Sequence, residues 1–180
     1  MKRDVLNKLR ELYAPVAAEN YERLAAEFNA IADKFAAACA VIEPERDPAT
    51  MLDETVKVRG AFMDAQLLSH QLTAKSAVLQ AAATLFGTRI AREEELLGLT
   101  VGSADLHRRR VYEAWNYEGG RTGRFGALVG LGARIRAAEL SHFTAYRKPQ
   151  PLQEKWVPRG YGHRRVIIDP EDEQHVEVPA

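Results

Sequence analysis

The apolar positions in the first quarter of the chain follow the period of an α-helix. Their spacings of four and three residues place them on one stripe. That stripe consists of Leu24, Phe28, Ile31, Phe35, Ala38 and Ile42, and upstream Val5, Leu9, Leu12 and Val16 continue the pattern. Pro15 interrupts it, because proline lacks the backbone donor and clashes with the preceding turn. We therefore expect a short first helix, a kink or restart at Pro15, and a helix to about residue 42.

A second helix is predicted from Pro48 to the glycine at position 87. Asp47 followed by Pro48 is a favoured helix start, and Gly87 is a suitable C-terminal cap. This span is about 39 residues, or about 58 Å of helix. One apolar stripe on it is Phe62, Ala65, Ser69, Leu72, Ser76, Leu79, Ala83 and Phe86, and an adjacent one is Met63, Leu67, Ala74, Val78, Ala81 and Leu85. Because an apolar face this wide needs neighbours on two sides, we expect the first helix on one side. The rest of the chain, or the same helix in another copy, would cover the other.

Shorter helices are predicted in the next part of the chain. The helical pattern continues to about Leu97 and is ended by Gly98. Ser103 is a candidate N-cap for a helix that runs through Glu118, with Val111 and Trp115 facing inward.

The segment from Gly120 to Arg136, with the sequence GRTGRFGALVGLGARIR, admits three interpretations. A phosphate-binding loop needs a lysine followed by serine or threonine, and none follows these glycines. A flexible connector would use Gly119, Gly120 and Gly123 as a hinge. The favoured interpretation is a helix whose glycines Gly123, Gly126 and Gly130 form a smooth stripe. Each interior glycine costs a helix about 1 kcal/mol, so a closely packed neighbour is expected on that stripe.

The C-terminal segment is predicted to be an extended arm. Residues 141–162 contain three prolines among Phe143, Tyr146, Trp156 and Tyr161, and prolines favour extended backbone. A small β-hairpin is expected to follow, with residues 166–168 as one strand, residues 170–173 as the turn and residues 175–178 as the return.

These elements predict a mainly α fold. A long antiparallel helical hairpin is followed by shorter basic helices and by an extended C-terminal arm ending in a small β-hairpin. The predicted domain boundaries give a helical hairpin domain at 1–97, a basic Gly/Arg-rich helical region at 98–142, and the arm at 143–180.

Charge is unevenly distributed although the formal net charge is zero. Residues 101–165 contain thirteen Lys and Arg against five acidic residues, whereas residues 166–180 contain five acidic residues and no basic one. The basic segment indicates either a polyanionic partner or an acidic one such as this tail. The candidate polyanion contacts are Arg108, Arg109, Arg110, Arg121, Arg124, Arg134 and Arg136.

No pattern for catalysis, metal binding or cofactor binding is present in the sequence. The five histidines form no metal-ligand spacing, and His70 is expected to be a hydrogen-bonded core residue. The single cysteine, Cys39, excludes an intramolecular disulfide. The first ten residues hold no apolar run typical of a secretory signal, and the longest uncharged run, Ser76 to Thr88, is too short to span a bilayer. We therefore expect no catalytic site, metal, cofactor, membrane contact or small-molecule substrate, and a cytoplasmic or virion location.

Helical hairpin and arm together favour a non-enzymatic, oligomeric structural or adaptor protein. Its partners would be further copies of itself and other protein subunits. By analogy of architecture alone, a phage virion component such as a head–tail connector or a scaffold-like subunit is one setting for such a chain. The expected interface residues are Phe62, Leu72, Leu79, Phe86, Gly123, Gly126, Gly130, Trp156 and Tyr161. The alternative is a nucleic-acid-binding protein, because residues 101–165 combine arginines with aromatic side chains that stack on unpaired bases.

Overall fold

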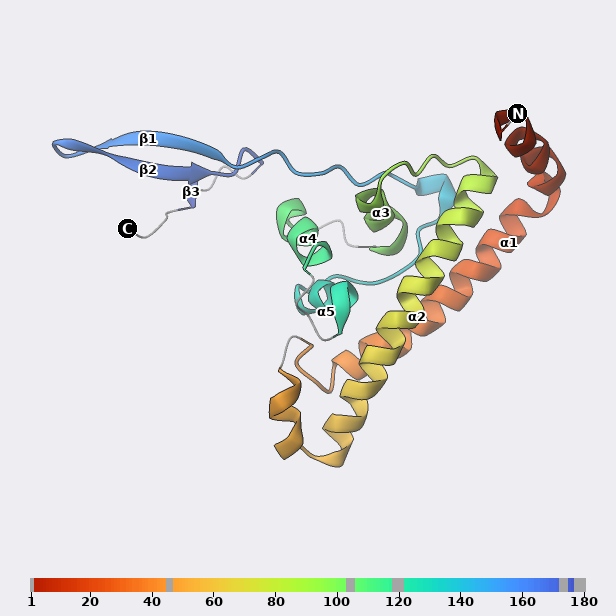
Figure 1. Cartoon of the computed structure of the whole chain (residues 1–180), viewed down its shortest axis with the longest axis horizontal. Coiled ribbons are helices and arrows are strands. Elements are labelled where there is room, and N and C mark those ends of the chain that lie inside the picture. Colours follow the sequence, from red (N-terminus) through yellow and green to blue (C-terminus); the bar gives the residue numbers. More distant parts are fainter. Residues whose placement is uncertain (1, 45–46, 103–105, 118–121, 172–174, 177–180) are drawn as a thin grey trace. The chain divides into compact units, whose positions relative to one another are not determined.

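The computed structural model of the chain is mainly helical and ends in a β-hairpin, as the sequence predicts (Figure 1). It describes residues 2–44, 47–102, 106–117, 122–171 and 175–176. The chain divides into two units, Met1–Arg147 and Lys148–Ala180. The predicted boundaries after residues 97 and 142 stay predictions.

The first unit is built on two long antiparallel helices, α1 (Lys2–Cys39) and α2 (Val56–Phe86). Figure 1 shows them side by side along most of their length. Their contact is made by one buried stripe from each helix, with Phe28 and Phe35 on α1 and Leu72 on α2 fully buried. Lys75 of α2 donates to Glu27 of α1 at 2.5 Å, and this hydrogen bond holds the pKa of Glu27 below its ordinary value.

Pro15 does not divide the first helix, which differs from the predicted restart. α1 is continuous through it, and Figure 1 shows a bend in the N-terminal part of this helix. A proline removes one backbone hydrogen bond and is tolerated at the cost of a kink. Pro15 is exposed, so its ring meets no packed neighbour.

The second helix is shorter than predicted, because Asp47 caps a separate turn. The Asp47 side chain accepts from Ala49 N, and a short 3-10 helix, η1 (Pro48–Asp53), follows. α2 then starts at its own N-cap, Thr55, whose hydroxyl accepts from Val58 N at 3.3 Å. The predicted C-cap is confirmed, since Gly87 has a φ of 115° and its amide donates to the carbonyl of Ala83.

The segment after Gly87 differs from the prediction, because the helix does not continue to residue 97. A 3-10 turn, η2 (Glu93–Glu95), leads into the short helix α3 (Leu96–Thr100), and Gly98 lies inside α3 instead of ending it. A Cβ atom at Gly98 would collide with the carbonyl oxygen of Thr144. Gly98 therefore permits close backbone approach, which a sequence pattern does not distinguish from helix termination.

Two eight-residue helices follow, α4 (Arg108–Trp115) and α5 (Gly123–Gly130), of which α5 packs against α2 and α4 packs against α5. Phe125 of α5 is fully buried and meets Phe28 and Trp115 edge-on, with ring centroids 6.4 and 5.9 Å apart. Val111 and Trp115 face inward, as predicted. The helix α4 is shorter than predicted, because it begins at Arg108 and ends at Trp115; the predicted ends, Ser103 and Glu118, lie outside the described residues.

Only the first half of the glycine-rich segment is helical. α5 ends at Gly130, and Gly132 takes a φ of 85°. Ile135 then pairs with Val101 in an isolated antiparallel bridge, so Arg134 and Arg136 lie on extended backbone and not on a helix. Tyr21 of α1 anchors the chain that follows by donating to Ala138 O at 2.7 Å, and burial raises the pKa of this phenol to about 12. A last 3-10 turn is η3 (Leu140–His142).

The second unit is a three-stranded antiparallel sheet with the order β1-β2-β3. β1 (Gln153–Arg159) pairs with β2 (Gly162–Ile168) along its whole length. β3 (His175–Val176) pairs with the end of β2, which is the small hairpin expected from the sequence. Part of its predicted turn, residues 172–173, lies outside the described residues. The prediction missed the longer hairpin, although it places Trp156 in the arm.

Core packing between α1 and α2 predicts a clear difference between two leucines on the same helix. Leu72→Ala should destabilise the protein by about 2–5 kcal/mol, because it leaves a cavity in a fully buried site. Leu67→Ala, at a position that is 58% exposed, should change the unfolding free energy of the monomer by less than about 0.5 kcal/mol. Urea denaturation under dilute, monomeric conditions measures both, and equal effects would contradict the assignment of the two faces.

Burial of Cys39 at the end of α1 predicts slow alkylation in the native state. Burial raises the pKa of its thiol to about 11, and the thiolate is the reactive form. At pH 8 the folded protein should react with iodoacetamide at least about tenfold more slowly than the urea-unfolded chain. Mass spectrometry of the adduct over time measures the ratio, and similar rates would show that the thiol is accessible.

Candidate interaction surfaces

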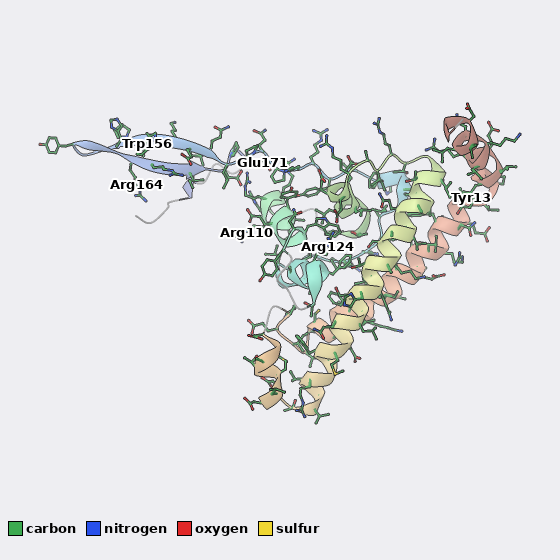
Figure 2. All side chains as sticks on the ribbon, in the orientation of Figure 1. Tyr13, Arg110, Arg124, Trp156, Arg164 and Glu171 are labelled. Carbon is green, nitrogen blue, oxygen red and sulfur yellow. The ribbon has the colours of Figure 1, made fainter. Side chains whose placement is uncertain are left out.

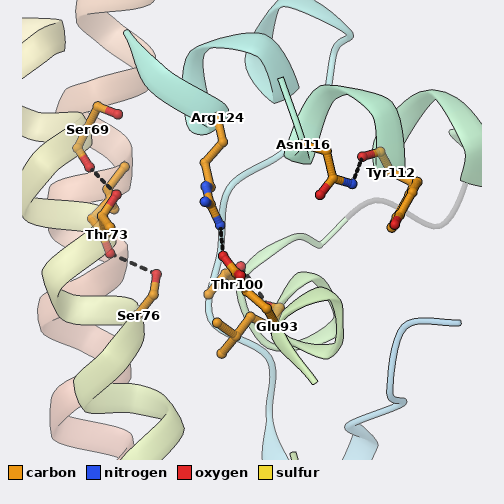
Figure 3. Close-up of polar contacts among 10 residues, drawn as sticks. Ser69, Thr73, Ser76, Glu93, Thr100, Tyr112, Asn116 and Arg124 are labelled. Atoms are coloured by element: carbon orange, nitrogen blue, oxygen red, sulfur yellow. Dashed lines mark hydrogen bonds and ion pairs between the residues drawn. The ribbon is translucent and has the colours of Figure 1, made fainter. Parts of the chain in front are cut away.

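The described residues hold no group of three side chains that could bind a metal ion. His70 differs from its prediction, because it is exposed and not in the core. It lines a polar cavity of 380 Å³ together with Ser69, Thr73, Trp115 and Arg124. Ser69 and Thr73 are bonded to each other along α2, since the Thr73 hydroxyl donates to the Ser69 carbonyl at 3.0 Å (Figure 3).

The two apolar stripes of α2 have different environments. The first packs into the chain's own core, so Phe62, Leu72 and Leu79 are 5% exposed or less. Phe86, at the end of that stripe, is 47% exposed. The second stripe faces outward, and its exposed members are Met63, Leu67, Ala74, Val78 and Ala81. A subunit interface at any of these residues stays a prediction, and the outward stripe is the one that a partner can reach.

The N-terminal part of α1 also presents apolar side chains to solvent. Val5, Leu9, Leu12 and Val16 recur at helical spacing, and all four are exposed, with Leu12 at 72%. Contiguous exposed apolar surface of this kind marks interaction sites in folded proteins.

Gly60 interrupts the outward face of α2 without any reason inside the chain. It lies within the helix, four residues after Val56 and three before Met63. A Cβ atom there would meet nothing within 4 Å, and a helix-interior glycine costs about 1 kcal/mol relative to alanine. Packing within this chain therefore does not account for the glycine.

The glycines of α5 meet a close neighbour at two positions, Gly123 and Gly126. A Cβ at Gly123 would lie 3.0 Å from the Ser69 hydroxyl of α2, and Gly123 has a φ of 66°. Gly126 is buried against Thr122, whose hydroxyl donates to Pro44 O at 2.9 Å. Gly130 faces open space. The close neighbour inferred from the sequence is thus the chain's own α2 at Gly123, and for Gly130 a partner remains a prediction.

The candidate arginines differ in their exposure to solvent and in the carboxylates near them. Arg108 and Arg110 of α4 are exposed, as are Arg134 and Arg136 on the extended segment, whereas Arg109 is half-buried. Arg121 lies outside the described residues. Three of the arginines share a cavity wall or an ion pair with a carboxylate. Arg124 forms an ion pair with Glu93, whereas Arg110 lines one cavity with Glu43 and Glu113, and Arg136 lines another with Glu22 and Glu139.

Arg124 is held by two contacts in the first unit. Its guanidinium lies over the Trp115 ring at 4.4 Å from the centroid and forms an ion pair with Glu93 at 2.6 Å (Figure 3). Cation–π stacking and a carboxylate partner both stabilise this cation in place. Arg124 therefore joins α5 to η2, and its charge is already balanced.

The β-hairpin presents its aromatic side chains to solvent. Trp156 is 62% exposed and Tyr161, in the two-residue loop, is fully exposed. Figure 2 shows Trp156 and Arg164 projecting from opposite sides of the hairpin. On the Trp156 side its cross-strand neighbour is Arg165, which forms an exposed ion pair with Glu154.

Sequence reasoning missed the turn that creates this hairpin, although a signal was present. The loop is Gly160-Tyr161, between the paired residues Arg159 and Gly162, and Gly160 has a φ of 56°. Two-residue hairpin loops require positive φ at the first position in a type II′ turn, and glycine supplies it. Pro158 obscured the signal, because proline within a strand usually indicates an edge strand or no strand.

In comparisons with known proteins, the chain matches no family model, no curated protein and no solved structure. Among the described residues, no helix has the length and apolar character needed to cross a membrane.

Two glycines in short helices provide a matched test of these environments. Gly98→Ala should destabilise the protein by about 1–3 kcal/mol, because its Cβ collides with the backbone at Thr144. Gly130→Ala, with nothing within 4 Å of its Cβ, should be neutral or stabilising by up to about 1 kcal/mol. Chemical denaturation of both variants measures the difference, and a stable Gly98→Ala protein would refute the close approach.

Proposed function

We propose that this chain is a non-enzymatic oligomeric protein that assembles through its helical hairpin. The observation that carries the proposal is the outward apolar stripe of α2, where Met63, Leu67 and Val78 are 69%, 58% and 43% exposed. Burial of one such side chain contributes about 1.5–3 kcal/mol. A second subunit on this face would therefore gain a substantial free energy that the lone chain does not.

The proposed role is that of a structural or adaptor protein. Long hairpins that pack side by side, joined to an arm on a separate unit, suit an assembly of many subunits. A phage virion component such as a head–tail connector or scaffold-like subunit is one setting for this role, with further copies and other protein subunits as partners. The fold supports this setting only by analogy of architecture.

Nucleic-acid binding is the second candidate, favoured by exposed cations of α4 at Arg108 and Arg110. Against it stands the ion pair of Arg124 with Glu93, together with carboxylates in the cavity walls that contain Arg110 and Arg136. Local neutralisation weakens the field that would attract phosphates. Self-assembly is therefore the better supported function.

Self-assembly predicts a defined oligomer in the absence of nucleic acid. At micromolar concentration, sedimentation should give a mass that is a multiple of the 20.1 kDa chain. The double variant Met63→Glu/Leu67→Glu should shift it toward monomer, because both charges would be buried in the interface. Ala37→Glu, at an exposed position of α1, serves as a control for added charge.

A monomer at all concentrations would refute the proposed function. If the purified protein instead binds DNA or RNA with an affinity that falls steeply as salt increases, the nucleic-acid alternative gains support. Charge reversal at Arg108 and Arg110 should then abolish that binding.

A further inference from the structure

The first turns of α2 present an apolar surface with a gap in its centre. Leu52 of η1 and Val56 are 76% and 77% exposed, and Met63 is 69% exposed. Gly60 lies between Val56 and Met63 on the same helical face, with open space where its side chain would be. The missing side chain at Gly60 leaves open space on a face that also carries exposed aliphatic side chains, and that space admits a large flat group from a partner.

A large flat group with no cover is present on the β-hairpin of the second unit. Trp156 stands on the face it shares with Glu154, Pro158, His163, Arg165 and Ile167, by the pairing register of β1 and β2. It is 62% exposed. Tryptophan and arginine are the side chains that most often dominate binding at protein interfaces, and this face carries one of each.

The two surfaces have opposite charge. Residues 47–64, which form η1 and the start of α2, contain four acidic and two basic residues, a net charge of −2. Residues 153–168, which form the hairpin, contain four basic residues and one acidic residue, a net charge of +3. Such complementarity steers two surfaces together and selects against contacts between like surfaces.

The hairpin is long enough to cover the first turns of α2, and hydrogen bonds hold the end of the sheet from which it projects. A seven-residue strand is about 23 Å long, and the helix from Val56 to Leu67 is about 17 Å long. Gln150 N of the connector donates to Glu171 at 3.0 Å, and Glu171 N donates to the buried carboxylate of Asp169 at 3.1 Å. These two hydrogen bonds join the connector before β1 to the chain that follows β2, and so hold the end of the hairpin opposite its loop.

We propose that the β-hairpin of one copy docks on the start of α2 of a second copy, with Trp156 seated over Gly60. Asp64, which lies beside this stripe on α2, faces Arg165 of the docked hairpin. The inference rests on the proposed function, because it names what covers part of the exposed face of α2. It also explains why a glycine occupies an exposed position inside a long helix.

The first test adds a side chain at Gly60 without destabilising the fold. Gly60→Gln should raise the melting temperature of the monomer, because glutamine favours helix and its Cβ meets no neighbour. It should nevertheless weaken self-association, and Trp156→Ala should weaken it by about thirtyfold or more. Ala37→Gln is the control, since it adds the same side chain at an exposed position of α1, away from the outward stripe of α2, and should leave the dissociation constant unchanged.

A charge exchange tests the orientation of the hairpin. Arg165→Glu should weaken association, and adding Asp64→Arg in the same chain should restore it. Lys155→Glu makes the same change of charge on the opposite face of the hairpin and should have a smaller effect. Sedimentation equilibrium of the full chain at two salt concentrations measures all of these variants.

The outcomes separate this inference from the proposed function. If the wild-type chain is a monomer, both fail. If the wild-type chain is oligomeric while Gly60→Gln and Trp156→Ala assemble as the wild type does, the docked hairpin is refuted and the proposed function stands. Equal losses for Arg165→Glu and Lys155→Glu, without rescue by Asp64→Arg, would also overturn the docking, because net charge alone would then explain the effect.

Discussion

The structure depends on the contact in which α1 and α2 each bury one stripe against the other. Phe28, Phe35, Leu72 and Leu79 fill this contact, and α5 adds Phe125 beside it. A pair of helices covers only one face of each partner. Because the helices α3 and α5 are short, they cover further parts of α2 but leave the stripe of Met63 and Leu67 in solvent.

The β-hairpin also has a face that its own unit does not cover. Two long strands and a third of two residues form a sheet that is too narrow to bury both faces, and small sheets of this kind are marginally stable without further packing. Val166 is buried while Trp156 is exposed. Both units thus leave apolar side chains in solvent because they have too few elements to cover every face. Assembly with other subunits would account for both exposed surfaces.

The sequence was sufficient for the long helices, because a 3.6-residue period over nine turns is a strong signal. It identified which stripe of α2 carries Leu72 and Leu79, and the cap at Gly87. The sequence did not predict the local structure where tertiary contacts determine it. Gly98 is required inside a helix because Thr144 approaches it closely, and Ile135 is extended because it pairs with Val101. Exposure of Met63 and Trp156 could not be predicted either, since periodicity places residues on a face without stating whether that face is covered.

A contact between unlike surfaces has a consequence for the form of the assembly. In the docking proposed above, each copy gives a hairpin and receives one, so the contact is heterologous. Repetition of such a contact closes into a dimer that exchanges arms, closes into a ring, or continues as a filament. The choice depends on the rotation that relates each copy to the next, because a rotation that closes gives a ring and one that does not gives a filament.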